Sequence, residues 1–180
     1  MSIILVITWG VIILCFGVKY IQKKYIYPLK YAQFVYEYAD EYGLEKALVF
    51  SVIKVESSFN EKATSKKNAI GLMQIKIPTA KFIAVELGKA SYDLYDAKTN
   101  INFGCYYIQY LYKKFNNMDT ALVAYNAGET TVRGWLKDER YSKDRESLYN
   151  IPYKESQEYL LKVKQSFVKY QKLYKNFVDK

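Results

Sequence analysis

The stretch from Leu44 to Gln74 reads LEKALVFSVIKVESSFNEKATSKKNAIGLMQ, and the interpretation of the whole chain starts from it. Apolar residues recur in its first half at the spacing of a helix face, with no Gly or Pro between them: Leu44, Leu48, Val52, Val55 and Phe59. Glu56 interrupts this pattern, and it projects from an apolar part of the helix surface because Val52 and Ile53 lie one turn before it. A carboxyl group in such a place loses water when the helix packs, so its pKa rises. A carboxylic acid that stays protonated near neutral pH suits general acid catalysis.

This pattern leaves two interpretations of Glu56 open. An acidic side chain on an apolar helix face is more often paired with Lys or Arg at the edge of a core than used in catalysis. The residues after Glu56 favour catalysis, and they are Ser57-Ser58-Phe59, then Ser65, then Ala69-Ile70-Gly71-Leu72-Met73-Gln74.

This run resembles the active-site signature of the soluble lytic transglycosylase family, whose catalytic domain has a goose-type-lysozyme fold. Ala124-Tyr125-Asn126-Ala127-Gly128 resembles the second motif of that family. Ile151-Pro152-Tyr153-Lys154-Glu155, with Tyr159 beyond it, resembles the third. The three motifs come in the family's order and cover roughly residues 30–175.

The resemblance implies that Glu56 is the catalytic acid. It also implies a set of substrate-binding residues: Ser65, Met73, Gln74, Tyr125, Asn126, Glu155 and Tyr159. In this family the residue matching Met73 floors the groove, the one matching Gln74 binds sugar, and the one matching Tyr125 points its hydroxyl at the catalytic carboxyl. Asn68 stands where the family often has Gly, a mild departure because Asn tolerates a left-handed backbone.

Each of these residues also has a structural interpretation. Met73 suits a gap in a core, and Gln74 suits an exposed loop amide. Asn126 before Gly128 is a common helix-end sequence. Glu155 in the first turn of a helix is favoured by the helix dipole alone.

The composition limits the chemistry that is available. The chain has 180 residues, enough for one domain and a short appendage. The net charge of +9 predicts an anionic partner, and the sequence contains no nucleic-acid-binding motif. The absence of His excludes Ser-His-Asp and Cys-His catalysis and any His-ligated metal. We therefore expect no metal and no cofactor, and a site made of carboxylates, hydroxyls and amides.

The N-terminus carries an uncharged apolar run over residues 3–18, which Tyr20 and Ile21 extend close to the length of a membrane span. We expect an uncleaved anchor through residues 3–21 rather than a signal peptide, because no small-residue cleavage site follows. Lys19, Lys23 and Lys24 after the run favour a cytoplasmic domain under the positive-inside rule. The motifs require the extracellular, cell-wall side, and that localisation is the prediction.

The predicted fold is mainly α, a lysozyme-like helical domain with a short loop or hairpin, preceded by one N-terminal hydrophobic helix. Residues 1–27 form the anchor, or signal sequence, and the linker, and residues 28–180 form the domain. Pro28 is expected at the start of the first helix and Gly43 at its end. Asp119 is expected to cap a later helix. Gly104 and Cys105, inside a helix over residues 100–115, predict the close approach of a neighbouring helix.

The predicted function is that of a peptidoglycan lytic transglycosylase, which cleaves the bond between N-acetylmuramic acid and N-acetylglucosamine without hydrolysis. Two alternatives stay open: a muramidase of the same fold, and a non-catalytic wall-binding or assembly protein. The expected partners are glycan strands, the membrane, and a cell-wall or secretion machine, for a monomeric protein without nucleic acid.

Overall fold

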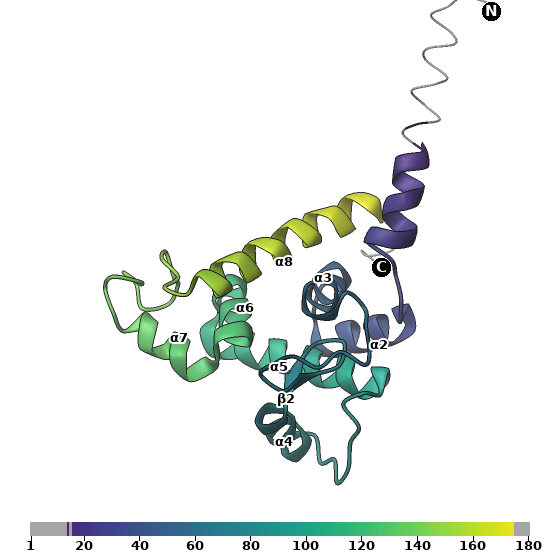
Figure 1. The fold of residues 1–180 in the computed structure, drawn as a ribbon. Helices are drawn as coiled ribbons and strands as arrows, with labels where there is room; N and C mark the ends of the chain where they lie inside the picture. Colours follow the sequence, from purple (N-terminus) through teal and green to yellow (C-terminus); the bar gives the residue numbers. More distant parts are fainter. Residues whose placement is uncertain (1–13, 15, 175–180) are drawn as a thin grey trace, which may run out of the picture.

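Helix α3 (Lys46–Ser57) lies at the centre of the fold, and it is buried on all sides over most of its length. Every residue from Lys46 to Ile53 is buried, whereas only the last turn reaches the surface. A helix that is apolar around its whole circumference belongs to the interior of a domain. Helix α8 (Lys154–Leu173), the longest helix within the described residues, packs against it, and Figure 1 shows α8 passing over α3.

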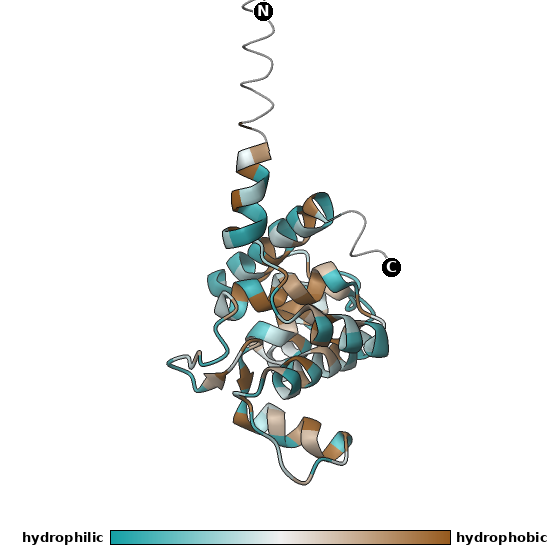
Figure 2. Ribbon diagram, turned by 90° about the vertical axis from the view of Figure 1, so that its right-hand side faces the viewer, coloured by the Kyte–Doolittle hydropathy of each residue, from teal (hydrophilic) through white to brown (hydrophobic). Residues whose placement is uncertain are grey.

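The structure is a computed structural model, and it describes residue 14 and residues 16–174. The other elements follow in chain order: η1 (Gln22–Ile26), α2 (Ala32–Tyr42), β1 (Ala69–Ile70), β2 (Ile75–Lys76), α4 (Ile77–Glu86), α5 (Ala97–Phe115), α6 (Met118–Ala127) and α7 (Glu129–Leu136). Helix α5 packs against α2 and α6, and α7 packs against α6. The mainly helical fold predicted from the sequence is confirmed. Apolar residues concentrate in the interior of the helical assembly in Figure 2.

The predicted hairpin is confirmed as well. Strands β1 and β2 pair antiparallel, with Ile70 opposite Ile75. Gly71 begins the connection at φ +80°, where a side chain would be strained, and a Cβ there would meet the Asn100 amide nitrogen at 2.2 Å. The connection is therefore held tightly against the start of α5.

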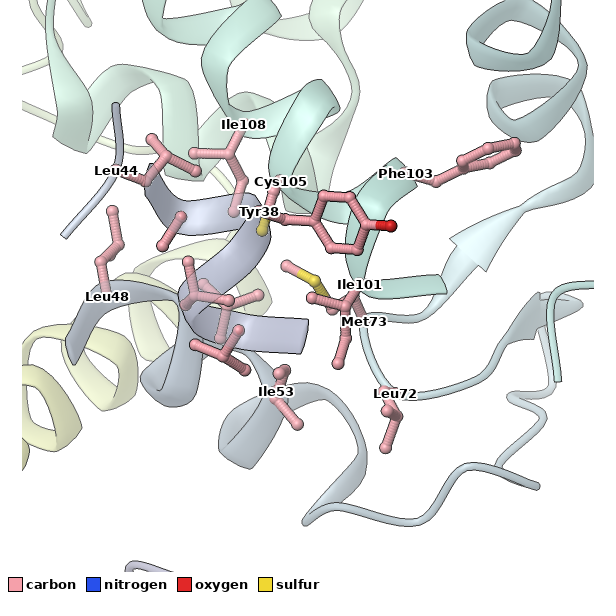
Figure 3. Packing of buried hydrophobic residues seen from close by; sticks show 14 of the residues in the cluster. Tyr38, Leu44, Leu48, Ile53, Leu72, Met73, Ile101, Phe103, Cys105 and Ile108 are labelled. Carbon is pink, nitrogen blue, oxygen red and sulfur yellow. The ribbon is translucent and has the colours of Figure 1, made fainter. Parts of the chain in front are cut away.

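Helix α5 presents Gly104 to the loop of the hairpin. A Cβ on Gly104 would lie 2.2 Å from the Met73 sulfur and 2.8 Å from its Cβ. The close neighbour of Gly104 is thus a side chain of the hairpin loop, and not a helix as the small residues suggested. Cys105, beside it, is fully buried. Figure 3 shows Met73 between Cys105 and Ile101 of this cluster.

Two predicted helix starts are wrong. Helix α2 begins at Ala32 and not at Pro28, because Tyr31 adopts a left-handed backbone at φ 60° and delays the helix. Asn117 and not Asp119 caps α6, since the Asn117 side chain accepts a hydrogen bond from the Thr120 N–H, which leaves Asp119 in the first turn. Gly43 ends α2 as expected.

The predicted N-terminal hydrophobic helix lies mostly outside the described residues, since residues 1–13 and 15 are not described. Within the described part of the chain, no helix is both long enough and apolar enough to cross a membrane.

Gly104→Ala should lower the free energy of unfolding by about 1 to 3 kcal/mol, because the added methyl group overpacks the core against Met73. Urea unfolding followed by circular dichroism measures the effect. The matched control is Gly134→Ala in α7, where a Cβ would have no neighbour within 4 Å. That substitution should stabilise the protein by up to about 1 kcal/mol, because Ala favours the helix. Equal effects of the two substitutions would contradict this packing.

Candidate active site

The last turn of α3 carries Glu56 out of the core and into a pocket. The helix ends at Ser57, and Ser58 and Phe59 both adopt left-handed backbone conformations, at φ 50° and 65°. Such conformations are costly for a bulky residue like Phe59. Phe59 is nevertheless buried against Phe50 of the same helix, so packing holds the turn that follows the catalytic candidate.

The pocket has a volume of about 240 Å³ and gathers side chains that are far apart in sequence. Six of the eight predicted site residues line it: Glu56, Ser65, Gln74, Tyr125, Asn126 and Glu155. Met73 and Tyr159 do not line it but are buried. The structure therefore brings the three sequence motifs together around Glu56.

Burial raises the pKa of the Glu56 carboxyl to about 7. The residue keeps part of its surface towards the pocket, yet protein surrounds the carboxyl group closely enough that lost hydration dominates. Tyr159 and the Lys76 ammonium group lower the pKa, and the Glu155 carboxylate raises it. A substantial fraction of Glu56 is therefore protonated at neutral pH, as a general acid requires.

Two tyrosines stand beside this carboxyl, the buried Tyr159 and the half-buried Tyr125. Burial, followed by the charge of Glu56, raises the pKa of both Tyr125 and Tyr159 well above the ordinary value, so both stay protonated. The Tyr125 hydroxyl donates a hydrogen bond to the Met73 carbonyl oxygen at 2.6 Å rather than to Glu56. The Tyr159 hydroxyl is near enough to lower the Glu56 pKa, although it has no partner of regular hydrogen-bond geometry among the described residues.

Met73 contributes to the site through its backbone. Its side chain is fully buried, which agrees with the core interpretation, and its carbonyl oxygen binds Tyr125. Gln74 turns into the pocket with φ 52°, and its amide nitrogen donates to the carbonyl oxygens of Ala63 and Gly71. Because the nitrogen is engaged, the Gln74 amide oxygen is the atom left to accept a hydrogen bond from a ligand hydroxyl.

Ser65 shapes the part of the pocket wall that the loop before β1 forms. Its hydroxyl oxygen accepts hydrogen bonds from the N–H groups of Lys67 and Ala69, at 3.2 and 3.0 Å, and so folds the loop before β1. Asn68 adopts φ 58° in this loop, which confirms that Asn accepts the left-handed backbone there. The Ser65 hydroxyl still has a proton to donate.

The third motif closes the pocket at the start of α8. The Ser156 hydroxyl donates a hydrogen bond to the Asn126 side-chain oxygen at 2.7 Å, which joins α8 to the end of α6. Glu155 is exposed and forms an ion pair with Lys67 at 2.9 Å. Glu155 is the only other acid that lines the pocket, and it is held by a cation at its rim.

Sequence reasoning missed two features of the site. Lys66, Lys67 and Lys76 line the pocket, and only their positions beside the first motif gave any signal. Asn100 is buried and fully engaged: it donates to the carbonyl oxygens of Ile70 and Leu94 and accepts from the Met73 N–H. An Asn at the fourth position of a helix offered no signal of this role.

The Glu56 pocket is the candidate active site because of the side chains that line it, and not because of its size. A larger hollow of about 580 Å³ lies between the end of α2, the starts of α3 and α6, the second half of α5 and the middle of α8. Its acids Glu45 and Asp119 bind Gln171 and Lys164. No group of three acids or cysteines gathers as a metal site within the described residues. The expectation of a metal-free, cofactor-free site stays a prediction.

Residues 33–150 match the family model described as the Transglycosylase SLT domain. The chain is 32% identical over 158 residues to the soluble lytic murein transglycosylase of Salmonella typhimurium, covering 84% of this chain and 24% of that protein. It is 41% identical over 125 residues to the membrane-bound lytic murein transglycosylase E of Buchnera aphidicola, covering 63% of this chain and 54% of that protein.

Solved structures show the same fold. An inactive Glu→Gln mutant of the lytic transglycosylase Slt of Pseudomonas aeruginosa superposes with a TM-score of 0.71 at 31% identity, over 81% of this chain and 24% of that one. The 70-kDa soluble lytic transglycosylase of Escherichia coli gives 0.71 at 30% identity, over 81% and 25%. The predicted lysozyme-like fold is thereby confirmed. The chain spans less than a quarter of the length of the soluble curated relatives.

The Glu56 environment makes stability depend on pH. The folded pKa of about 7 lies above the ordinary value of 4.5. The contribution of Glu56 to stability is therefore fully present below pH 4.5 and is lost as pH rises through 7, because the unfolded chain releases the proton first. The loss amounts to at most about 3 kcal/mol.

Glu56→Gln should remove this loss and be more stable than the wild type at pH 8, with little difference at pH 4. Chemical unfolding across this pH range measures it, with the exposed Glu139→Gln as the control. Parallel pH profiles for wild type and Glu56→Gln would contradict the assigned environment.

Proposed function

The chain belongs to the Transglycosylase SLT domain family, and we propose that it cleaves the β-1,4 bond between N-acetylmuramic acid and N-acetylglucosamine in peptidoglycan as a lytic transglycosylase. The observation that carries the proposal is a single acid, Glu56, with a pKa of about 7, in a pocket formed by all three motifs. The lytic murein transglycosylase names of the relatives support the same substrate.

Glu56 acts first as the general acid. Its proton passes to the glycosidic oxygen as the bond to muramic C1 breaks, so the departing N-acetylglucosamine leaves with a hydroxyl group. The acetamido group of the muramic residue stabilises the cationic carbon. Tyr125 and Tyr159 stay neutral beside the new carboxylate and leave it free to accept a proton.

Glu56 then acts as the base. It removes the proton from the muramic O6 hydroxyl, and O6 bonds to C1 to close a 1,6-anhydro ring. The proton that Glu56 gave in the first step returns to it in the second, and no water is consumed. One carboxyl group is therefore sufficient for the complete reaction.

The other side chains of the pocket are assigned to substrate binding. The Gln74 amide oxygen accepts a hydrogen bond from a sugar hydroxyl, since its nitrogen is engaged by the loop. Ser65 and Asn126 offer a hydroxyl proton and an amide nitrogen from two different segments of the pocket lining. Met73 acts through its carbonyl oxygen, which fixes Tyr125.

A muramidase of the same fold is the second candidate, and the Lys67–Glu155 ion pair disfavours it. Hydrolysis needs a second carboxylate to activate water or to attack the sugar. Glu155 is the one other acid of the pocket, and it is exposed and paired with Lys67. A non-catalytic wall-binding role is disfavoured by the raised pKa of Glu56, because pure binding does not require a protonated acid.

We assign residues 1–27 to an anchor and linker and residues 28–180 to the enzyme domain on the cell-wall side of the membrane. The membrane-bound relatives support this arrangement, although soluble relatives exist too. A monomeric state and recruitment by a cell-wall or secretion machine stay predictions.

Glu56→Gln should lower the rate of glycan cleavage by about a thousandfold or more, because the side chain can no longer donate or accept the proton. Digestion of purified sacculi measures the rate, and sedimentation with sacculi measures binding, which should persist. Glu139→Gln, the same change on an exposed loop, should behave as wild type. Turnover by Glu56→Gln would refute the assignment of the acid.

Mass spectrometry of the wild-type products separates the two enzyme candidates. The products should carry 1,6-anhydro ends, which are lighter by one water than reducing ends. Reducing ends alone would assign the chain to the muramidase class.

A further inference from the structure

The segment that leads into the domain is fastened to the end of α8. The Tyr174 hydroxyl donates to the carbonyl oxygen of Tyr27 at 2.8 Å, and the Lys23 ammonium lies 4.8 Å from the Tyr174 ring centre. The Tyr170 hydroxyl donates to the Pro28 carbonyl oxygen at 3.1 Å, and its ring packs edge-on against Tyr27. Residues separated by more than 140 positions thus form one joined surface. There the N-terminal helix, described at residue 14 and residues 16–21 and continued by η1, meets the end of α8 in Figure 1.

A hollow of about 890 Å³ lies in this joined surface. Its walls are the apolar side chains of the N-terminal helix, among them Leu14 and Phe16, together with four lysines: Lys19, Lys23, Lys169 and Lys172. No acid lines the hollow, and none of the four lysines forms an ion pair within the described part of the chain. A cationic rim beside apolar walls fits a ligand that has both an anionic group and an apolar part.

The wider surface repeats this combination. Residues 14–36 and 161–174 contain eight lysines and no acid, and two of these lysines, Lys162 and Lys164, pair with Glu158 and Asp119 outside these ranges. Seven of the fifteen exposed large hydrophobic side chains of the described residues lie between Leu14 and Ile26. Polyanions such as nucleic acid would use the lysines but leave the apolar side chains in water. A second copy of the chain would bring lysines against lysines.

We propose that this hollow binds an anionic phospholipid, with the phosphate between the lysines of the N-terminal helix and those of α8, and the acyl chains beside Leu14 and Phe16. Lysines near an anionic membrane surface each strengthen binding, and apolar side chains enter the acyl layer. The proposal does not depend on the enzymatic activity.

Bound lipid fixes the distance of the pocket from the membrane. Helix α8 carries Glu155 in its first turn and Lys169 near its end, about 21 Å apart along the helix axis. The membrane-facing end and the catalytic end are thus two ends of one rigid helix. Lys19 and Lys23 then bind lipid phosphate on the side of the membrane where the domain lies. This role accounts for their position, although the positive-inside rule would place these lysines in the cytoplasm.

Native mass spectrometry of the full chain in detergent tests the proposal. Phosphatidylglycerol and phosphatidylcholine with identical acyl chains are titrated separately, and the lipid-bound fractions are compared. We expect wild type to retain phosphatidylglycerol at least about fivefold more tightly than phosphatidylcholine. Lys19→Gln/Lys169→Gln/Lys172→Gln should abolish the difference.

The matched control removes the same charge elsewhere, with Lys81→Gln/Lys89→Gln/Lys137→Gln at exposed positions in α4, after α4 and after α7. This control should keep the preference, and thermal unfolding checks that both variants are folded. Equal retention of the two lipids by wild type, or equal loss in the control, would overturn the proposal. Full competition by glycerophosphoglycerol, the same headgroup without acyl chains, would also overturn it, because the lysines would then bind a free phosphate.

Discussion

Loss of hydration at one carboxyl group is the constraint on which the site depends. Helix α3 is buried around its whole circumference up to Ile53, and its packing fixes where the next turn meets the surface. Glu56 lies in that turn, surrounded closely enough that its pKa reaches about 7. The free energy that keeps this carboxyl poorly hydrated comes from the packing of the apolar residues before it. The catalytic group and the core are therefore one structural feature.

Polar contacts between distant segments hold the pocket open around this carboxyl. Asn100 binds both ends of the hairpin loop, and Tyr125 binds the carbonyl oxygen of Met73 within that loop. Asn126 joins α6 to α8 through Ser156. Each of these bonds is buried or partly buried, where an unpaired polar group would be costly. The walls consequently have little freedom to move against Glu56, which favours a site assembled before substrate binds.

The helices could be predicted because apolar periodicity is a property of neighbouring residues in the sequence. The residues that gather in the pocket could be predicted because each belongs to one of three short motifs. Gly43 ends α2 and the hairpin forms where expected. The contacts between motifs were not predictable in the same way. Tyr125 binds a backbone carbonyl instead of Glu56, and Lys67 crosses the pocket to Glu155, since both contacts are set by tertiary packing. The predicted cap of α6 was wrong because two neighbouring side chains, Asn117 and Asp119, can each accept a hydrogen bond from a free N–H at a helix start. In the structure Asn117 accepts it, from Thr120.

The ionisation of the Glu56 carboxyl in the folded protein is the most direct measurement of the central claim. Carbon-13 labelling of the glutamate side chains allows an NMR titration, and the Glu56 signal is identified by its absence in a variant at that position. The account predicts a midpoint near pH 7. A midpoint at or below the ordinary 4.5 would show a well-hydrated or cation-paired carboxylate, and it would contradict the role of Glu56 as a proton donor.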